Sequence, residues 1–210
     1  MATAATTLRI GLADNGRTMT LEEFLDAEEE PGYRYELARG VLEVTYVPGR
    51  PHGLIVYYLF RMLTLYGERN PRRIDRFGGA AEFRLWLPAM VSGRNPDVAV
   101  ALRNTPKDES GDRPPMLAME IVSEGEAAHH RDYVTKREEY LAFGLREYWI
   151  VDRFLQRITV LIRRGDTWTE RVFPNGQSAE GLVLPGFAVP VSDLGKILAD
   201  DEADNAETPA

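Results

Sequence analysis

The fold of this chain is decided by two short apolar runs, DVAVAL at residues 97–102 and MLAMEIV at residues 116–122. Nearly continuous apolar runs of this length are typical of β-strands that are buried on both faces of a sheet. An acid nevertheless opens the first run and another interrupts the second, namely Asp97 and Glu120. Burying an ionised carboxylate costs on the order of several kcal/mol unless a cation or a hydrogen-bond donor compensates its charge. These two residues are therefore the first candidates for a functional site.

Helical and strand patterns flank the two runs on both sides. Thr20 and Glu23 have the spacing of a capping box and predict a short helix, and alternating apolar residues at 33–46 around Arg39-Gly40 predict a hairpin. Helical spacing then predicts helices at 54–66 and 131–143, and further strands are predicted at 83–87, 147–151, 157–162 and 168–173. The pattern indicates an α/β fold, more narrowly an α+β mixed central sheet flanked by helices, with an N-terminal helix and hairpin.

The length of 210 residues and the composition favour one domain with tails. We expect a single domain at 18–198, a disordered N-terminal tail at 1–17 and an acidic disordered tail at 199–210. The chain has no cysteine, which excludes a disulfide framework, a thiolate zinc site and a cysteine nucleophile. That composition, with no signal-peptide pattern and no apolar stretch long enough for a bilayer, indicates a cytoplasmic protein without a membrane partner.

The net charge of −8 argues against simple electrostatic capture of nucleic acid. The charge is unevenly spread, however, because five acids crowd the last eleven positions: Asp200, Asp201, Glu202, Asp204 and Glu207. Removing these five charges from −8 leaves −3 for the rest of the chain. Basic residues that could line a local groove include Arg69, Arg72, Arg73, Arg76, Arg163 and Arg164.

Asp97 and Glu120 would converge on one cation if their two strands are neighbours in the sheet. Carboxylate oxygens and a few waters suit hard divalent ions, so the expected metal is Mg²⁺ or Mn²⁺. The alternative is that each acid is paired with an arginine or lies at a helix terminus, and the two runs alone leave that open.

Several ordered motifs resemble the PD-(D/E)XK nuclease superfamily, and within it the restriction-endonuclease group called Uma-two. The resemblance covers about residues 18–195. The matching segments are Tyr35-Glu36-Leu37 with Gly40, His52-Gly53, Pro96-Asp97-Val98-Ala99-Val100, Glu120-Ile121-Val122-Ser123, Lys136-Arg137-Glu138-Glu139-Tyr140 with Gly144, Glu147-Tyr148-Trp149-Ile150-Val151-Asp152, and Leu184-Pro185-Gly186-Phe187. The resemblance implies a restriction-endonuclease-like core with its metal site where two adjacent strands meet.

The resemblance also implies roles for individual residues. Asp97 and Glu120 would be metal ligands, and the carbonyl of Ile121 would complete the shell. Lys136 would orient or deprotonate the attacking water. The lysine that the superfamily places two residues after the glutamate is Val122 here, and the Uma-two group is similar in placing its lysine on the next helix.

The residues themselves give a partial check on the lysine. Tyr133, Lys136 and Tyr140 are spaced i, i+3, i+7 and so would share one inward face of a helix. Arg137 could share part of that face, and Lys136 could instead extend past the aromatic rings to solvent. Both alternatives remain open at this point.

Two further candidates carry less weight, and one pair is set aside. His52 would face the site from the start of the long helix, or serve only in local capping and packing. Glu36 is a possible third acid, or an exposed strand glutamate. His129 and His130 are expected in a loop without a functional role, because adjacent residues on a helix would not face each other.

These observations together predict a metal-dependent endonuclease that hydrolyses phosphodiester bonds, DNA more than RNA, and that works as a homodimer by family analogy. The alternative is a non-catalytic module that retains the nuclease fold and binds nucleic acid or protein.

Overall fold

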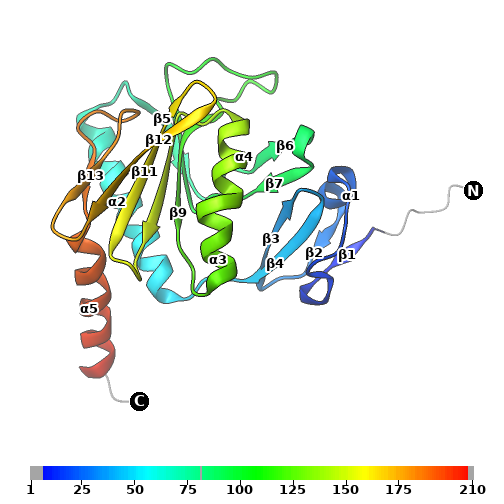
Figure 1. Ribbon diagram of the computed structural model, residues 1–210, viewed down its shortest axis with the longest axis horizontal. Coiled ribbons are helices and arrows are strands. Elements are labelled where there is room, and N and C mark those ends of the chain that lie inside the picture. Colours follow the sequence, from blue (N-terminus) through cyan, green and yellow to red (C-terminus); the bar gives the residue numbers. More distant parts are fainter. Residues whose placement is uncertain (1–6, 81, 208–210) are drawn as a thin grey trace, which may run out of the picture. The chain divides into compact units, whose positions relative to one another are not determined.

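The protein is described by a computed structural model, which gives the backbone of residues 7–80 and 82–207 and the side chains up to residue 203. The chain forms two compact units in place of the single expected domain. The first unit contains the residues before 49 together with 84–95, and the second contains 49–83 and the residues from 96 onward. Figure 1 shows the elements of both units.

The first unit is a small antiparallel sheet with a helix. Its four-stranded sheet has the order β4-β3-β7-β6, made of β4 (Val41–Tyr46), β3 (Tyr33–Ala38), β7 (Ser92–Arg94) and β6 (Leu85–Leu87). The short 3-10 helix η2 (Pro88–Met90) joins β6 to β7. The predicted hairpin is confirmed as β3 and β4, and Arg39 and Gly40 both take positive φ at its turn, as a type I′ turn requires.

The remaining elements of the first unit precede that sheet in the chain. They are β1 (Arg9–Ile10), η1 (Leu12–Asp14), α1 (Leu21–Asp26) and β2 (Glu28–Glu29). The capping box at α1 is confirmed: the amide of Glu23 donates to the Thr20 hydroxyl at 3.1 Å, and the amide of Thr20 donates to Glu23 Oε2 at 2.8 Å.

The expected disorder of residues 1–17 does not hold where the structure describes them. Ile10 is completely buried, and Leu8 and Leu12 pack against the same core as Phe24 and Leu37. Alternating apolar residues at positions 8, 10 and 12 thus bury enough surface to order this segment. Residues 1–6 lie outside the described part of the chain.

The second unit is built on a six-stranded mixed sheet. Its order is β12-β11-β10-β9-β8-β5, from β12 (Thr167–Pro174), β11 (Arg157–Arg164), β10 (Glu147–Asp152), β9 (Pro115–Ile121), β8 (Val98–Leu102) and β5 (Ile74–Gly78). Only the pair β9–β10 is parallel within this described sheet, and a helical crossover joins those two strands. All residues of β8 and β9 are buried, which confirms the strands predicted from the two apolar runs.

Helices cover the two faces of this sheet (Figure 1). The long helix α2 (Arg50–Arg69) packs its Ile55, Leu59 and Leu63 against one face, where Val98 and Met119 lie. On the other face lies a continuous helical segment made of α3 (Glu126–His130), the π-helical turn η3 (Arg131–Thr135) and α4 (Lys136–Phe143). No helix in the described ranges has the length and apolar character of a membrane span.

The last described elements are a pair of short antiparallel strands and a helix. Strands β13 (Ser178–Glu180) and β14 (Ala188–Pro190) are antiparallel, and helix α5 (Ser192–Glu207) follows. The expected disordered tail from residue 199 is therefore helical to residue 207. Leu194 is buried and Leu198, one helical turn later, packs on the main core. These two leucines anchor the helix, and the acidic residues extend it toward the C-terminus.

Candidate functional site

Asp97 directly precedes strand β8 of the second unit, and Glu120 lies on its neighbour β9. Strands β8 and β9 are antiparallel with Val98 opposite Met119, so the next position in that register sets Asp97 opposite Glu120. Directly opposed residues have Cβ atoms about 4.5–5.5 Å apart. Both acids are buried, with 7% and 2% of their surface exposed. The register thus brings the two carboxylates together as expected.

Asp97 is held by a backbone amide and by a histidine. Its Oδ2 accepts a hydrogen bond from the amide of Ile121 at 2.9 Å, and its Oδ1 lies 3.2 Å from His52 Nε2. His52 lies in the first turn of α2, so its ring faces Asp97 as the family resemblance implies, and local capping alone does not describe it. Its buried Nδ1 has no hydrogen-bond partner within the described chain.

Glu120 is held by two side chains of α4. Lys136 Nζ lies 2.9 Å from Glu120 Oε1, and the hydroxyl of Tyr140 donates to the same oxygen. Lys136 is only 2% exposed, so it does not extend to solvent. Arg137, the alternative on this helix, instead contacts Glu170 at 2.7 Å in an exposed pair. The structure therefore places Lys136 in the site, while its role in a reaction remains a prediction.

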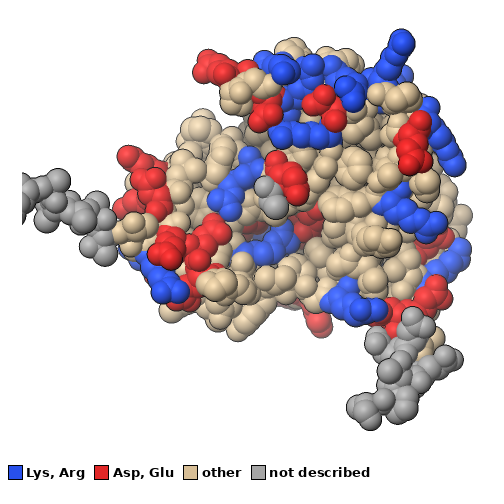
Figure 2. Space-filling view, turned by 180° about the vertical axis from the view of Figure 1, so that it is seen from behind, with Lys and Arg blue, Asp and Glu red and all other residues tan. Residues whose placement is uncertain are grey.

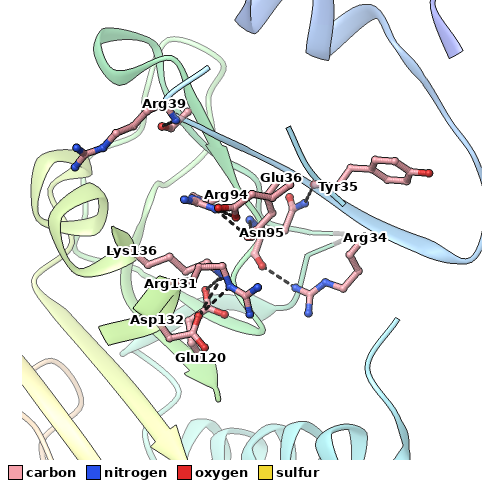
Figure 3. Close-up of polar contacts among 12 residues, drawn as sticks. Arg34, Tyr35, Glu36, Arg39, Arg94, Asn95, Glu120, Arg131, Asp132 and Lys136 are labelled. Atoms are coloured by element: carbon pink, nitrogen blue, oxygen red, sulfur yellow. Dashed lines mark hydrogen bonds and ion pairs between the residues drawn. The ribbon is translucent and has the colours of Figure 1, made fainter. Parts of the chain in front are cut away.

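A third acid, Asp132, belongs to this cluster and was missed from the sequence. It is 1% exposed, and its Oδ1 lies 4.0 Å from Lys136 Nζ and 3.3 Å from Arg131 Nε (Figure 3). Asp132 precedes Lys136 by four residues, a spacing that places both on one helix face. That spacing was present in the sequence and could have identified it.

The π-helical turn explains why Tyr133 does not share the inward face that was predicted for it. Hydrogen bonds in a π turn link residues five apart, so residues three apart no longer align. The buried face of the helix consists of Asp132, Lys136, Glu139 and Tyr140. Tyr133 is half-buried and donates its hydroxyl to Asp152 Oδ2 at 3.0 Å. Single π turns within α-helices are frequent at functional sites.

Burial and the charges of three acids of the site raise the pKa of one tyrosine, Tyr148. The buried Tyr148 donates its hydroxyl to the carbonyl of Asp132 at 2.9 Å. Burial raises the pKa of Tyr148 well above its usual value, and the charges of Asp132, Glu120 and Asp97 raise that pKa further. The charges of all three carboxylates thus act on one ring.

The donor set fits a hard divalent cation that keeps part of its water shell. Asp97 and Glu120 offer carboxylate oxygens, and Ile121, next to Glu120 in the chain, contacts Asp97 through its amide. Within the part of the chain that the structure describes, no group of three or more His, Cys, Asp and Glu side chains is arranged to hold a metal ion. Mg²⁺ is usually held by only one or two carboxylates plus waters, so two acids meet its requirement.

Glu36 is built into the first unit and is not the exposed strand glutamate that the sequence left open. Its Oε2 lies 3.2 Å from Arg94 Nη1, and its Oε1 accepts from the amide of Asn95 at 2.8 Å (Figure 3). Arg94 is completely buried and also contacts Glu43 at 2.6 Å. Any part that Glu36 plays in catalysis remains a prediction.

His129 and His130 lie at the end of helix α3, not in a loop as expected. The ring of His129 stacks on Tyr133 with centroids 4.2 Å apart, and His130 is exposed. Stacking on an aromatic ring gives His129 a packing contact.

The sequence matches the family Uma2, described as "Putative restriction endonuclease", over residues 21–192. The chain belongs to the Uma2 family. A solved structure described as a "putative nuclease belonging to DUF820" from Anabaena variabilis has the same fold, with a TM-score of 0.67 and 21% identity. That similarity covers 86% of this chain and 99% of the other. No curated protein matches the chain.

Membership in the Uma2 family agrees with the resemblance found in the motifs, and the fold agrees with the predicted mixed sheet flanked by helices. The family description supports a nuclease, that is, a hydrolase of phosphodiester bonds with a nucleic acid as substrate.

Proposed function

We propose that this member of the Uma2 family is an endonuclease that cuts DNA with the help of Mg²⁺ or Mn²⁺ bound by Asp97 and Glu120. The observation that carries the proposal is the buried arrangement of these two acids on adjacent strands with Lys136 Nζ 2.9 Å from Glu120 Oε1. Acids from two strands and a lysine in contact with them supply the groups that metal-assisted hydrolysis needs. When bound, the ion would polarise a phosphoryl oxygen and make its water more acidic.

Each side chain then has a separate task. Asp97 and Glu120 hold the cation, and the carbonyl of Ile121 is the third protein ligand. The Ile121 amide and His52 fix the orientation of the Asp97 carboxylate through the contacts at 2.9 and 3.2 Å. Lys136 is a donor that holds the attacking water or stabilises the charge developing on the phosphate. Asp132 and Tyr140 position Lys136 and Glu120 from the same helix.

DNA is the preferred substrate and a homodimer the preferred assembly, on the analogy of restriction endonucleases, which cut both strands of a duplex. Glu36 remains a further candidate acid in this proposal, because in the first unit it is buried beside Arg94 and is more than a surface charge.

One feature favours the second candidate, a binding or assembly module that keeps the fold without turnover. Both acids already have partners inside the protein, since Asp97 contacts His52 and Glu120 contacts Lys136. A site that is neutralised internally can be purely structural.

Plasmid cleavage distinguishes the two candidates. The purified protein is incubated with supercoiled plasmid in Mn²⁺, in Mg²⁺ and in EDTA, beside the Asp97→Asn variant. Asparagine keeps an acceptor for the Ile121 amide, whereas alanine would leave that buried donor unsatisfied at a cost of about 1–3 kcal/mol. We expect nicking that needs the metal and is lost in Asp97→Asn. Equal nicking by the variant would contradict the role of Asp97 as a metal ligand, and no nicking by the wild type would support the binding module.

A further inference from the structure

A pocket of about 590 Å³ in the second unit is lined mainly by arginine and apolar side chains. Five arginines converge on it from three places in the sequence: Arg72, Arg73, Arg146, Arg163 and Arg164. Its volume lies within the range of about 300–1,000 Å³ that is usual for small-molecule sites. We call this site the arginine pocket.

Only one arginine of the pocket has an acidic partner in the described chain: Arg163 Nη2 lies 3.8 Å from Asp166 Oδ1. No acid is among its lining residues. In the described part of the chain, the side chains of Arg72, Arg73, Arg146 and Arg164 form no hydrogen bond or ion pair with the protein. The nearby arginines differ, because Arg103 and Arg113 contact Asp75 at 3.9 and 3.6 Å and Arg76 contacts Asp112 at 3.6 Å. Figure 2 shows basic side chains gathered along the upper edge of the face drawn, with acids among them.

The framework behind these arginines is well fixed. Arg163 is half-buried, and its Nη1 donates to the carbonyl of Leu141 at 2.5 Å. The backbone amide of Arg163 donates to the carbonyl of Arg146 at 2.9 Å, which keeps the ends of β10 and β11 together. Glu147, next to Arg146, accepts hydrogen bonds from the amides of Leu182 and Val183 at 2.6 and 3.0 Å and so holds the apolar wall in place.

The apolar part of the lining distinguishes this site from a simple anion patch. Leu102, Ile162, Leu182 and Val183 offer a hydrophobic surface beside the guanidinium groups. A ligand that suits both halves carries a phosphate and a flat, largely apolar group. Arginine forks bind phosphate oxygens in pairs, and guanidinium planes also stack on aromatic rings. A nucleoside phosphate has both parts.

The arginine pocket is separate from the proposed cleavage site. Leu102 ends strand β8 at the pocket, whereas Asp97 precedes the other end of the same strand. Five residues of extended chain separate them by about 17 Å. The pocket therefore holds a different part of a bound molecule from the bond that is cut, or a different molecule.

We propose that the arginine pocket binds a nucleoside phosphate, with the phosphate among Arg72, Arg146 and Arg164 and the base against Leu182 and Val183. This nucleoside phosphate is either a free nucleotide or one nucleotide of a nucleic-acid strand. Binding requires no hydrolysis, so the inference holds whether or not the protein cuts DNA.

The inference is tested by measuring the binding of three small molecules and one oligonucleotide. EDTA is present in these measurements to prevent metal-dependent cleavage. Calorimetry measures 5′-dAMP, deoxyadenosine and inorganic phosphate, and fluorescence anisotropy measures a labelled single-stranded oligonucleotide. The proteins are the wild type, Arg72→Gln, Arg164→Gln and the control Arg103→Gln, which removes the same charge from an arginine outside the pocket lining. All changed side chains are exposed, and melting temperatures verify that the variants are folded.

We expect 5′-dAMP to bind more tightly than deoxyadenosine or phosphate. Each pocket variant should weaken its binding about tenfold or more, and Arg103→Gln should change it much less. A free nucleotide is the source if 5′-dAMP binds in this way. A strand is the source if only the oligonucleotide binds and the same two variants weaken it.

Three results would overturn the inference: no binding of 5′-dAMP or oligonucleotide, equal binding by pocket and control variants, or binding of phosphate or deoxyadenosine as tight as that of 5′-dAMP. Asp97→Asn serves as the link to the proposed function. It should abolish cleavage and leave the binding of 5′-dAMP unchanged, so that failure of one proposal is seen separately from failure of the other.

Discussion

The ammonium group of Lys136 lies 2.9 Å from Glu120 Oε1, and both side chains are almost completely buried. Their contact joins helix α4 to the C-terminal end of strand β9, which is the neighbour of β8 in the sheet. The next residue, Arg137, is directed to Glu170 at the surface. One helical position thus separates a residue inside the site from one outside it.

That difference gives a matched pair of variants. Lys136→Met keeps the length of the side chain and removes its charge, and it should lower kcat about 10²–10⁴-fold because a donor to the water or the phosphate is lost. The affinity for Mn²⁺ should not weaken, since the ammonium does not coordinate the ion. Plasmid cleavage rates and a Mn²⁺ titration measure the two quantities. If Arg137→Met is the more damaging change, the wrong position on the helix has been assigned.

Asp132 should act through Lys136. Asp132→Asn keeps the shape and removes the charge that lies 4.0 Å from the ammonium, and we expect kcat to fall about 10–100-fold with little change in KM. The exposed Asp166→Asn is a control of equal charge. A purely structural role for Asp132 would lower the melting temperature and leave kcat per folded molecule unchanged.

Tyr58 and Asp193 connect α2 to α5 and provide a prediction about pH. The Tyr58 hydroxyl donates to Asp193 Oδ2 at 2.8 Å. Burial alone would raise the pKa of Asp193, but hydrogen bonds from Tyr58 and Lys196 outweigh it and hold that pKa below the usual value. The ionised carboxylate therefore stabilises the fold above the unfolded pKa of about 3.9, and this stabilisation is lost as the pH falls through the lower folded pKa.

Tyr58→Phe should lower the free energy of unfolding by about 1 kcal/mol near neutral pH, and the melting temperature by about 2–4 °C. The difference from wild type should shrink as the pH falls below 3.9. Tyr57→Phe, an exposed residue of the same helix, is the control and should change neither value. A Tyr58→Phe difference that stays constant down to the lowest pH would mean that Asp193 is not the partner that matters.

A divalent cation should stabilise the fold. Binding only to the native state contributes RT ln(1 + [M]/Kd), about 1.4 kcal/mol at ten times Kd, or about 3–6 °C for a chain of this size. The increase should occur with Mn²⁺ or Mg²⁺, be reversed by EDTA and be absent in NaCl of matched ionic strength. It should also be smaller in Glu120→Gln. Equal melting temperatures with and without Mn²⁺ would favour the binding module.

The sequence predicts the central elements well, because their patterns are local. Nearly continuous apolar runs identified β8 and β9, and the capping box at Thr20 located α1. Asp97 and Glu120 were recognisable because a charge within such a run needs compensation. Lys136 followed from the family resemblance and from its spacing to Tyr133 and Tyr140, of which only Tyr140 shares its buried face.

What the sequence could not show depends on contacts between distant segments. Residues 84–95 pair with β3 through Leu37 and Gly93, and this long-range pairing creates the first unit. The π-helical turn at Arg131–Thr135 has no recognisable local pattern in the sequence. The contact of His52 with Asp97 likewise arises only when α2 is placed on the sheet.

The central claim is that Asp97 and Glu120 share one divalent ion, and crystals soaked in Mn²⁺ test it most directly. The anomalous difference map, collected beside that of Glu120→Gln crystals, locates the ion without reference to activity. The account predicts one strong peak in contact with an oxygen of both Asp97 and Glu120, weakened in the variant. A map with no peak there at saturating Mn²⁺, or with peaks only at the acidic residues of α5, would contradict it.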